Sequence, residues 1–257
     1  MSRPTIALLH GWGLDRRVWD ELAAVLEADF DLRRLDLPGY HGTPDLPDNS
    51  VAATVNWLLD QLPEGCTLVG WSLGALLAQL MAKQAPAKIA RLVLVAGTPC
   101  FTQGPDWLAG QTPELLATFS AAVREQPDSV LISVLSRFAA LINQGDAQAR
   151  AITRRLAPLT RAPLPAPATL ARGLDWLRDL DLRTLTPQLP QPCLLLHGDQ
   201  DPLMPLAAAQ WLVATLPQAG LEIFPGVAHC PFLAAPERFA RSLAAFAAGG
   251  SLPPRQS

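Results

Sequence analysis

The sequence has few charged residues and no long apolar run. Charged side chains make up 17% of the 257 residues, and the formal net charge is −3. Proteins that bind nucleic acid usually carry a basic excess, which is absent here. No uninterrupted apolar stretch approaches the roughly 20 residues that a transmembrane helix needs. The sequence therefore predicts neither nucleic acid nor a membrane as a partner.

Cysteine is also sparse, and its spacing argues against a disulfide framework. The four cysteines form no CxxC pair and no regular short spacing; they are Cys66, Cys100, Cys193 and Cys230. Reduced thiols of this kind are typical of cytoplasmic proteins. The apolar run at residues 5–9 is too short for a secretory signal, and no cleavage site follows it. We therefore expect a cytoplasmic protein, which we take to be a monomer.

The sequence does contain ample apolar material, arranged in short runs. Hydrophobic residues make up 49% of the chain, and its length suits one large domain or one domain with an insertion. Two helix-like segments, Val18–Leu26 and Ala75–Lys83, alternate with strand-like runs. These five runs are Ile6–Leu9, Thr67–Val69, Leu92–Val95, Cys193–Leu196 and Leu221–Phe224. The alternation predicts an α/β fold with a mostly parallel central sheet and helices on both faces.

Residues 100–180 interrupt this pattern. The segment has no strand-like run and is typical of several helices separated at prolines such as Pro113 and Pro127. We interpret it as a helical cap inserted into a core that residues 1–99 and 181–250 form. Residues 251–257 are expected to be a flexible tail.

The strongest functional motif is the stretch Gly70–Trp71–Ser72–Leu73–Gly74. This Gly-x-Ser-x-Gly motif lies between a strand-like run and a helix-like run, where a sharp turn can expose a nucleophilic serine. The bare pattern also arises by chance in glycine-containing loops, but this context favours the nucleophile. The following helix directs its positive end towards a developing oxyanion. We predict that Ser72 is the nucleophile.

A second glycine-rich turn, His10–Gly11–Trp12–Gly13, follows the first predicted strand. It lies at the carboxyl edge of the sheet, where ligands bind in open α/β sheets. The backbone N–H groups of Trp12 and Leu73 are therefore candidates for an oxyanion hole. The alternative is an ordinary turn with a core tryptophan, and the serine motif favours the oxyanion hole. His10 is expected to brace this loop by hydrogen bonds.

Among the four histidines, His229 is the candidate general base. It follows a late apolar run, and an imidazole that titrates near neutrality can accept and return the serine proton. His197, at a strand end, and His41, in a loop, are expected to be mainly structural, although His41 could touch substrate. The acid that orients the base should follow the fourth predicted strand, where Asp199 and Asp201 compete.

These motifs make the sequence resemble the α/β-hydrolases, in which serine, acid and histidine follow one another in this order. A closer resemblance, from about residue 5 to 245, is to the pimeloyl-acyl carrier protein methyl ester esterases of biotin synthesis. The stretches that carry it are Leu9–Leu14 with Val18–Trp19, Leu35–Gly39, Gly70–Gly74, Thr98–Phe101, Arg137–Leu141, Gly173–Leu177 with Asp179–Arg183, and Ala228–Phe232. The family spacing favours Asp201 over Asp199, because Asp201 lies three residues after Gly198 and four before Pro205.

The resemblance implies a serine carboxylesterase with a triad of Ser72, Asp201 and His229. Its substrate would be a methyl ester on an acyl chain that acyl carrier protein holds, and the reaction needs no metal or other cofactor. The family also implies a substrate-binding set, which is Trp12, Ser72, Leu73, Phe138, Ala139, Ala140, Leu141, Ile142 and His229.

The predicted cap has an excess of basic residues. Between Ser129 and Leu174 there are six arginines and one acid, Asp146, so this segment has a net charge of +5 against −3 for the whole chain. Such a surface can attract an acidic partner or hold a phosphate, although a solvated helical face is the alternative. Acyl carrier protein is acidic and its prosthetic arm bears a phosphate, so we expect a carrier contact. The candidate residues are Arg137, Arg150, Arg154 and Arg155.

Two other kinds of function are compatible with this pattern. A small-molecule carboxylesterase, lactonase or thioesterase would use the same fold and triad, and would prefer short free esters with no gain from the carrier. A non-catalytic binding protein of the same fold would normally have lost a triad residue, whereas all three are present.

Overall fold

A six-stranded sheet forms the centre of the computed structural model, which describes residues 3–124, 126–161 and 163–255. Its strand order is β2-β1-β3-β4-β5-β6, and every pair of neighbours is parallel. The strands are β1 (Thr5–Leu9), β2 (Asp31–Leu35), β3 (Cys66–Trp71), β4 (Ile89–Val95), β5 (Cys193–Gly198) and β6 (Ala219–Phe224). The predicted parallel α/β fold is therefore confirmed, and all five predicted strands are present.

The strand that the sequence analysis missed is β2, at one edge of the sheet. Every residue of β3 and β5 is buried, which explains why these strands stand out as apolar runs. Only Leu35 of β2 is buried, and its sequence, Asp-Leu-Arg-Arg-Leu, has neither an apolar run nor a regular alternation. Charged side chains on an edge strand also oppose pairing with another sheet.

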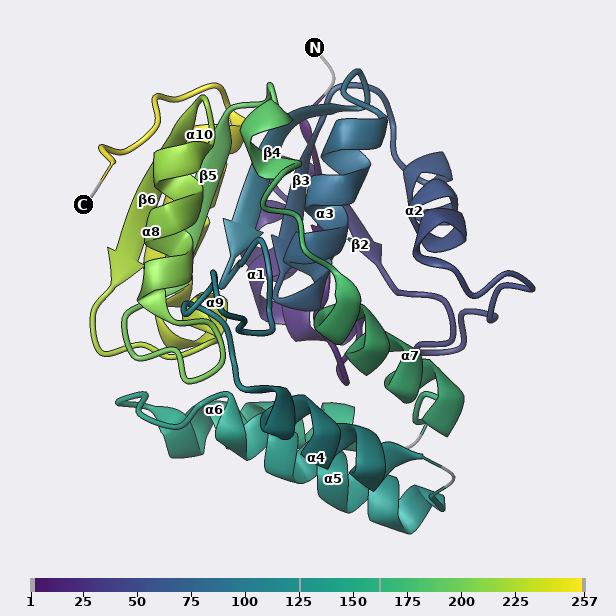
Figure 1. Cartoon of the computed structure of the whole chain (residues 1–257). Helices are drawn as coiled ribbons and strands as arrows, with labels where there is room; N and C mark the ends of the chain where they lie inside the picture. The colour runs from purple at the N-terminus through teal and green to yellow at the C-terminus, as the bar shows by residue number, and fades with distance from the viewer. Residues whose placement is uncertain (1–2, 125, 162, 256–257) are drawn as a thin grey trace.

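Helices cover both faces of the sheet (Figure 1), with α2, α3 and α8 on one face and α1 and α10 on the other. Their bounds are η1 (Arg16–Trp19), α1 (Asp20–Leu26), α2 (Val51–Asp60), α3 (Leu73–Gln84), η3 (Thr186–Gln188), α8 (Leu206–Thr215), α9 (Pro231–Ala234) and α10 (Pro236–Ala247). The predicted helix over residues 18–26 is present as η1 followed by α1, and the one over 75–83 as α3.

The segment between β4 and β5 is helical, as the sequence predicts. It contains α4 (Pro113–Val123), α5 (Asp128–Leu141), α6 (Ala149–Leu156), η2 (Ala157–Thr160) and α7 (Pro167–Asp179). Pro113 and Pro167 occupy the first turns of their helices, where the missing N–H costs nothing. In Figure 1, α4, α5 and α6 lie beyond the ends to which the strand arrows point. They are therefore placed over the carboxyl edge of the sheet.

The two ends of this helical segment lie side by side. Cys100 forms an isolated antiparallel bridge with Asp181, and the backbone N–H of Leu182 donates to the carbonyl of Pro99 at 2.8 Å. The segment thus leaves and re-enters the sheet region at neighbouring points. Its treatment as a separate cap domain stays a prediction.

Leu252, Pro253 and Arg255 contact the core, and the flexibility expected of residues 251–257 stays a prediction. The guanidinium of Arg255 donates to the carbonyls of Leu216 and Pro217, and Pro253 lies against Gly220 of β6. Residues 256 and 257 lie outside the described part of the chain. None of the helices in the described ranges combines the length and apolarity required to cross a bilayer.

Candidate active site

Ser72 occupies a strained turn between β3 and α3. Its backbone has φ 57° and ψ −119°, a conformation that L-residues rarely adopt. The backbone N–H of Ser72 donates to the carbonyl of Val95 at 3.0 Å, which ties the turn to β4. This geometry is that of the nucleophile turn which the Gly-x-Ser-x-Gly motif predicts.

The glycines on either side of Ser72 permit the tight turn. A Cβ atom at Gly74 would lie 2.5 Å from the carbonyl oxygen of His10 and 2.6 Å from that of Leu9. A Cβ atom at Gly70 would collide with the backbone of Gly74. The turn therefore packs backbone against backbone, which only glycine allows.

We expect Gly74→Ala to lower the free energy of unfolding by roughly 3 kcal/mol, because the added methyl group meets two carbonyl oxygens that belong to β1 and its following turn. Urea denaturation measures the change. Gly104→Ala is the matched control, since the nearest atom to its Cβ would be an Asp106 oxygen at 3.8 Å. Equal stabilities of the two variants would contradict this account of the turn.

Asp201 and His229 form a buried hydrogen-bonded pair. The carboxylate of Asp201 follows β5, and its Oδ2 lies 2.7 Å from Nδ1 of His229, with both side chains fully buried. The other oxygen, Oδ1, accepts the backbone N–H groups of Leu203 and Met204, each at 2.9 Å. These bonds fix the carboxylate, and the carboxylate fixes the imidazole ring.

Trp71 joins the serine turn to the loop of His229. Its indole N–H donates to the backbone carbonyl of His229 at 2.9 Å, and the two ring centroids lie 5.5 Å apart. Nε2 of His229 is buried without a hydrogen-bond partner, so Ser72 and His229 are not hydrogen-bonded in this structure. Such bonds are often long before substrate binds. The structure thus brings the histidine and the acid together. The serine directly follows Trp71, the residue that is bonded to the histidine loop.

Gly11 brings the turn after β1 against the serine. A Cβ atom at Gly11 would lie 3.0 Å from Cβ of Ser72. Within the described residues, the backbone N–H groups of Trp12 and Leu73 donate to no protein acceptor. Both groups are therefore available to an oxygen atom bound beside Ser72.

A narrow apolar cavity opens onto Ser72. Its empty volume is about 350 Å³. Among the described residues that line it, Ser72 contributes the only side-chain oxygen. The lining residues are Trp12, Ser72, Phe101, Leu115, Leu116, Phe119, Phe138, Leu174, Leu177 and Leu203. Most of them come from α4, α5 and α7. The helical segment therefore supplies most of the cavity wall.

Trp12 links the turn after β1 to the helices that line the cavity. Its indole N–H donates to the carbonyl of Leu170 in α7 at 2.8 Å, and its ring contacts Phe119 and Phe138 edge to face. The residue whose backbone N–H is a candidate oxyanion donor is therefore bonded through its side chain to the helical segment.

The predicted substrate set is only partly assembled at this cavity. Phe138 lines it, whereas Ala140 is exposed and Leu141 lines a neighbouring hollow between α4 and α5. Ala139 is buried outside the lining, and the carbonyl of Ile142 accepts the backbone N–H of His229 at 3.2 Å. The α4 residues Leu115, Leu116 and Phe119 also line the cavity, but nothing in their sequence pattern distinguishes a cavity wall from an ordinary helix core.

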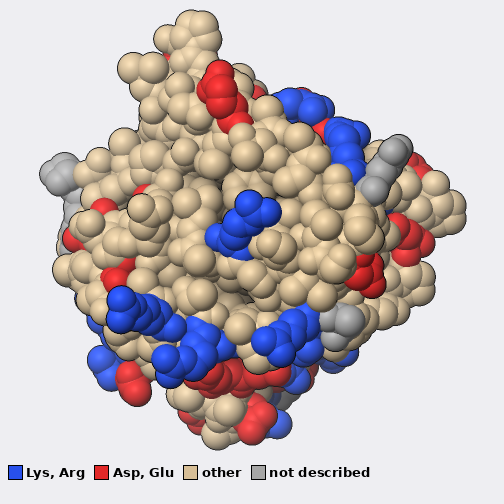
Figure 2. All heavy atoms as spheres, turned by 90° about the horizontal axis from the view of Figure 1, so that it is seen from below, with Lys and Arg blue, Asp and Glu red and all other residues tan. Residues whose placement is uncertain are grey.

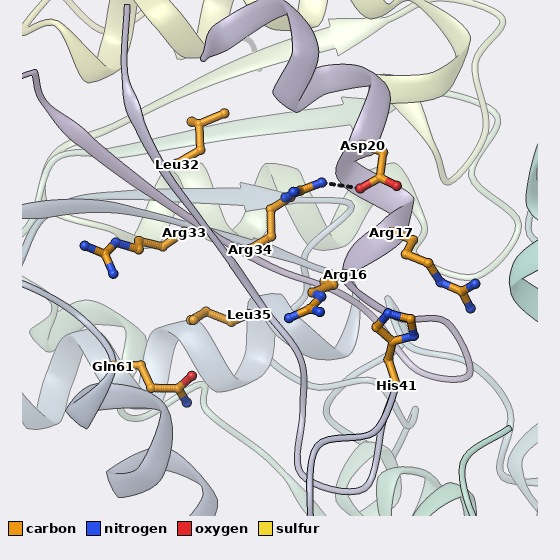
Figure 3. Close-up of a pocket in the computed structure, with 9 residues that line it drawn as sticks. All are labelled: Arg16, Arg17, Asp20, Leu32, Arg33, Arg34, Leu35, His41 and Gln61. Atoms are coloured by element: carbon orange, nitrogen blue, oxygen red, sulfur yellow. Dashed lines mark hydrogen bonds and ion pairs between the residues drawn. The ribbon is translucent and has the colours of Figure 1, made fainter. Parts of the chain in front are cut away.

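The remaining candidates have structural environments. His10 Nε2 accepts the backbone N–H of Leu37 at 3.0 Å, and His197 Nε2 lies 2.7 Å from the carbonyl of Met204. Burial lowers the pKa of both imidazoles, which favours their neutral forms. Oδ1 of Asp199 accepts the backbone N–H of Gly226 at 2.7 Å, so this aspartate braces the histidine loop. His41 lies among arginines in a separate open hollow beside β2 (Figure 3).

The model of the alpha/beta hydrolase family matches residues 6–242. The chain belongs to the α/β-hydrolase family. It is 40% identical to a pimeloyl-[acyl-carrier protein] methyl ester esterase of Aromatoleum aromaticum, covering 92% of this chain and 95% of that protein. It is 37% identical to the esterase of the same name from Nitrosomonas europaea, covering 92% of each. Both the predicted fold and the predicted resemblance to these esterases are confirmed.

The solved structures of other α/β-hydrolases agree with this fold. An esterase from Exiguobacterium antarcticum superimposes with a TM-score of 0.85 at 21% identity, covering 96% of this chain and 93% of that one. An enol-lactonase from Burkholderia xenovorans superimposes with a TM-score of 0.81 at 17% identity, covering 96% and 92%. Because one fold supports both activities, the fold alone does not decide the substrate.

Proposed function

We propose that the chain is a serine carboxylesterase that hydrolyses the methyl ester of pimeloyl-acyl carrier protein. The observation that carries the proposal is the buried Asp201–His229 pair, which Trp71 bonds to the turn of Ser72, together with the apolar cavity that Ser72 lines. The esterases with 37% and 40% identity are named for this substrate. The proposal assigns the three residues the roles of acid, base and nucleophile.

The reaction follows from the positions of these groups. His229 accepts the hydroxyl proton while Ser72 attacks the ester carbonyl, and Asp201 stabilises the imidazolium and holds its tautomer. The backbone N–H groups of Trp12 and Leu73 donate to the oxyanion. The tetrahedral intermediate collapses as His229 protonates the departing methoxide, which gives methanol and an acyl-serine. Water, activated by the same histidine, then releases the carboxylate product.

The composition of the cavity supports a neutral ester as the substrate. No charged side chain lines it among the described residues, so a methyl ester can enter without leaving a charge unpaired. The carboxylate that hydrolysis forms is poorly solvated in these surroundings, which favours its release. A methylene chain is also suited to a wall of leucine, phenylalanine and tryptophan.

The basic face of the helical segment supports a carrier-bound substrate. Figure 2 views the molecule from the side of α4–α6, where basic side chains gather along the lower edge of a mostly uncharged face and acidic side chains lie directly below them. Arg137, Arg150 and Arg154 are exposed and form no ion pair with other described residues. Arg155 instead pairs with Glu21 and donates to the carbonyl of Leu233 at 2.7 Å. We therefore assign carrier contact to the first three, and a bracing role to Arg155.

The substrate assignment is tested by comparing methyl pimeloyl-acyl carrier protein with p-nitrophenyl esters and lactones. We expect the carrier-bound methyl ester to have the highest kcat/KM. A preference for short free esters, with no gain from the carrier, would assign the chain to another esterase activity. Complementation of a biotin auxotroph that lacks this esterase, with Ser72→Ala as the negative control, tests the same assignment in cells.

Reversal of two arginine charges should separate carrier binding from chemistry. Arg150 and Arg154 lie four residues apart on α6 and therefore on the same side of it. We expect the double change Arg150→Glu and Arg154→Glu to lower kcat/KM for the carrier-bound ester about tenfold at low salt, and less as ionic strength rises. Hydrolysis of p-nitrophenyl butyrate should be unchanged, and Arg241→Glu, exposed on α10, is the matched control. Equal losses on both substrates would contradict a carrier contact.

A further inference from the structure

The turn between α5 and α6 is bonded to the loop that carries His229. Two backbone hydrogen bonds join them, from His229 N–H to the carbonyl of Ile142 at 3.2 Å and from Ala147 N–H to the carbonyl of Gly226 at 3.1 Å. A third bond runs from Ala228 N–H to the side-chain Oδ2 of Asp146 at 2.9 Å. The helical segment therefore holds the histidine loop directly.

Asp146 is the only side chain of the turn in this set of bonds. Its carboxylate is buried, and Oδ1 accepts the backbone N–H of Gln148 at 2.6 Å while Oδ2 reaches Ala228. One oxygen thus shapes the start of α6, and the other holds the residue before His229. Charge-assisted bonds of this kind are shorter and stronger than neutral ones.

The histidine loop is also bonded to the loop that carries Asp201. The carboxylate of Asp199 accepts Gly226 N–H, and the backbone N–H of Gln200 donates to the carbonyl of Val227 at 2.9 Å. The loop is therefore bonded to two aspartates, Asp199 through Gly226 and Asp146 through Ala228. Asp199 belongs to the sheet region, and Asp146 belongs to the helical segment.

We propose that Asp146 is a positioning residue, which sets the place of His229 through the Ala228 N–H and links it to the helices that line the cavity. This inference rests on the proposed role of His229 as the base. Loss of the bond frees the residue next to the imidazole, and a displacement of about 1 Å can lower the rate of such a reaction about a hundredfold. The same segment carries Phe138 on α5, so the cavity wall and the base share one support.

Two variants of the full chain test this role. Asp146→Ser keeps a short acceptor for Gln148 N–H but cannot reach Ala228, and Asp146→Asn replaces one acceptor oxygen with an amide donor. We expect kcat for p-nitrophenyl butyrate, per folded molecule by near-ultraviolet circular dichroism, to fall between about tenfold and a hundredfold in both variants. KM should change less than twofold, because the cavity lining is untouched. Asp48→Asn is the control, since Oδ1 of Asp48 makes a similar local bond to Ser50 N–H at 2.8 Å.

The outcomes separate this inference from the proposed function. A kcat within threefold of the parent for folded Asp146→Ser, or a loss confined to KM, overturns the positioning role. The ester used does not depend on the carrier, so a failure of the carrier-bound substrate leaves this test intact. Ser72→Ala is measured in parallel, and retained hydrolysis by that variant would overturn the proposed function itself, whatever the Asp146 variants do.

Discussion

Replacement of Ser72 by alanine is expected to lower kcat by roughly 10⁵- to 10⁶-fold, because removal of the nucleophile leaves only binding and oxyanion stabilisation. The fold should be retained, since alanine at this position is strained by the backbone φ of 57° to about the same extent as serine. Initial rates with methyl pimeloyl-acyl carrier protein and with p-nitrophenyl butyrate measure the loss.

Covalent labelling provides a second measurement of the same change. A fluorophosphonate should add once to the parent protein and not to Ser72→Ala, as intact-mass spectrometry would detect. Ser242→Ala is the matched control, because its hydroxyl donates only to the carbonyl of Arg238 within α10. More than one per cent residual activity in a preparation free of the parent enzyme would rule out Ser72 as the nucleophile.

Asp201→Asn is expected to lower kcat about 10⁴-fold with little loss of structure. An asparagine carbonyl can still accept the N–H groups of Leu203 and Met204, but its amide then faces Nδ1 of His229. Nδ1 must become the acceptor, so the proton moves to Nε2, and the ring cannot accept a proton from Ser72. Steady-state kinetics and thermal unfolding, measured on the same preparation, separate the two effects.

Asp199→Asn distinguishes between the two aspartates that the sequence leaves in competition. Its Oδ1 accepts only Gly226 N–H and a weak bond from Gln200, both of which an asparagine carbonyl can also accept. We therefore expect a loss of less than tenfold. A larger loss for Asp199→Asn than for Asp201→Asn would reverse the assignment of the acid.

Much of the fold could be predicted because buried parallel strands appear in the amino-acid sequence as short apolar runs. β3 and β5 are buried along their whole length, so their sequences show them directly. β2 could not be found in this way, because four of its five residues are partly or fully exposed. Its place is fixed by pairing with β1, which is a contact between distant segments rather than a local pattern.

The same distinction explains what could be predicted of the site. Ser72 lies in a local motif whose spacing reflects the tight turn, and the glycines of that motif meet nearby backbone. The family spacing selected Asp201, which the structure pairs with His229. Asp146 appeared in the sequence only as the single acid of a basic segment, because its bond to Ala228 spans 82 residues. Long-range hydrogen bonds of this kind leave no periodic signal.

The adjacent ends of the helical segment, at Cys100 and Asp181, have a consequence for how such enzymes can diversify. A segment whose ends meet can be lengthened, shortened or exchanged between related enzymes while the strands keep their register. Selectivity for the acyl chain can then change independently of the hydrolytic centre. Any transplanted segment must nevertheless supply its own acceptor for the Ala228 N–H. Without that acceptor, the new cavity lining would leave His229 poorly positioned.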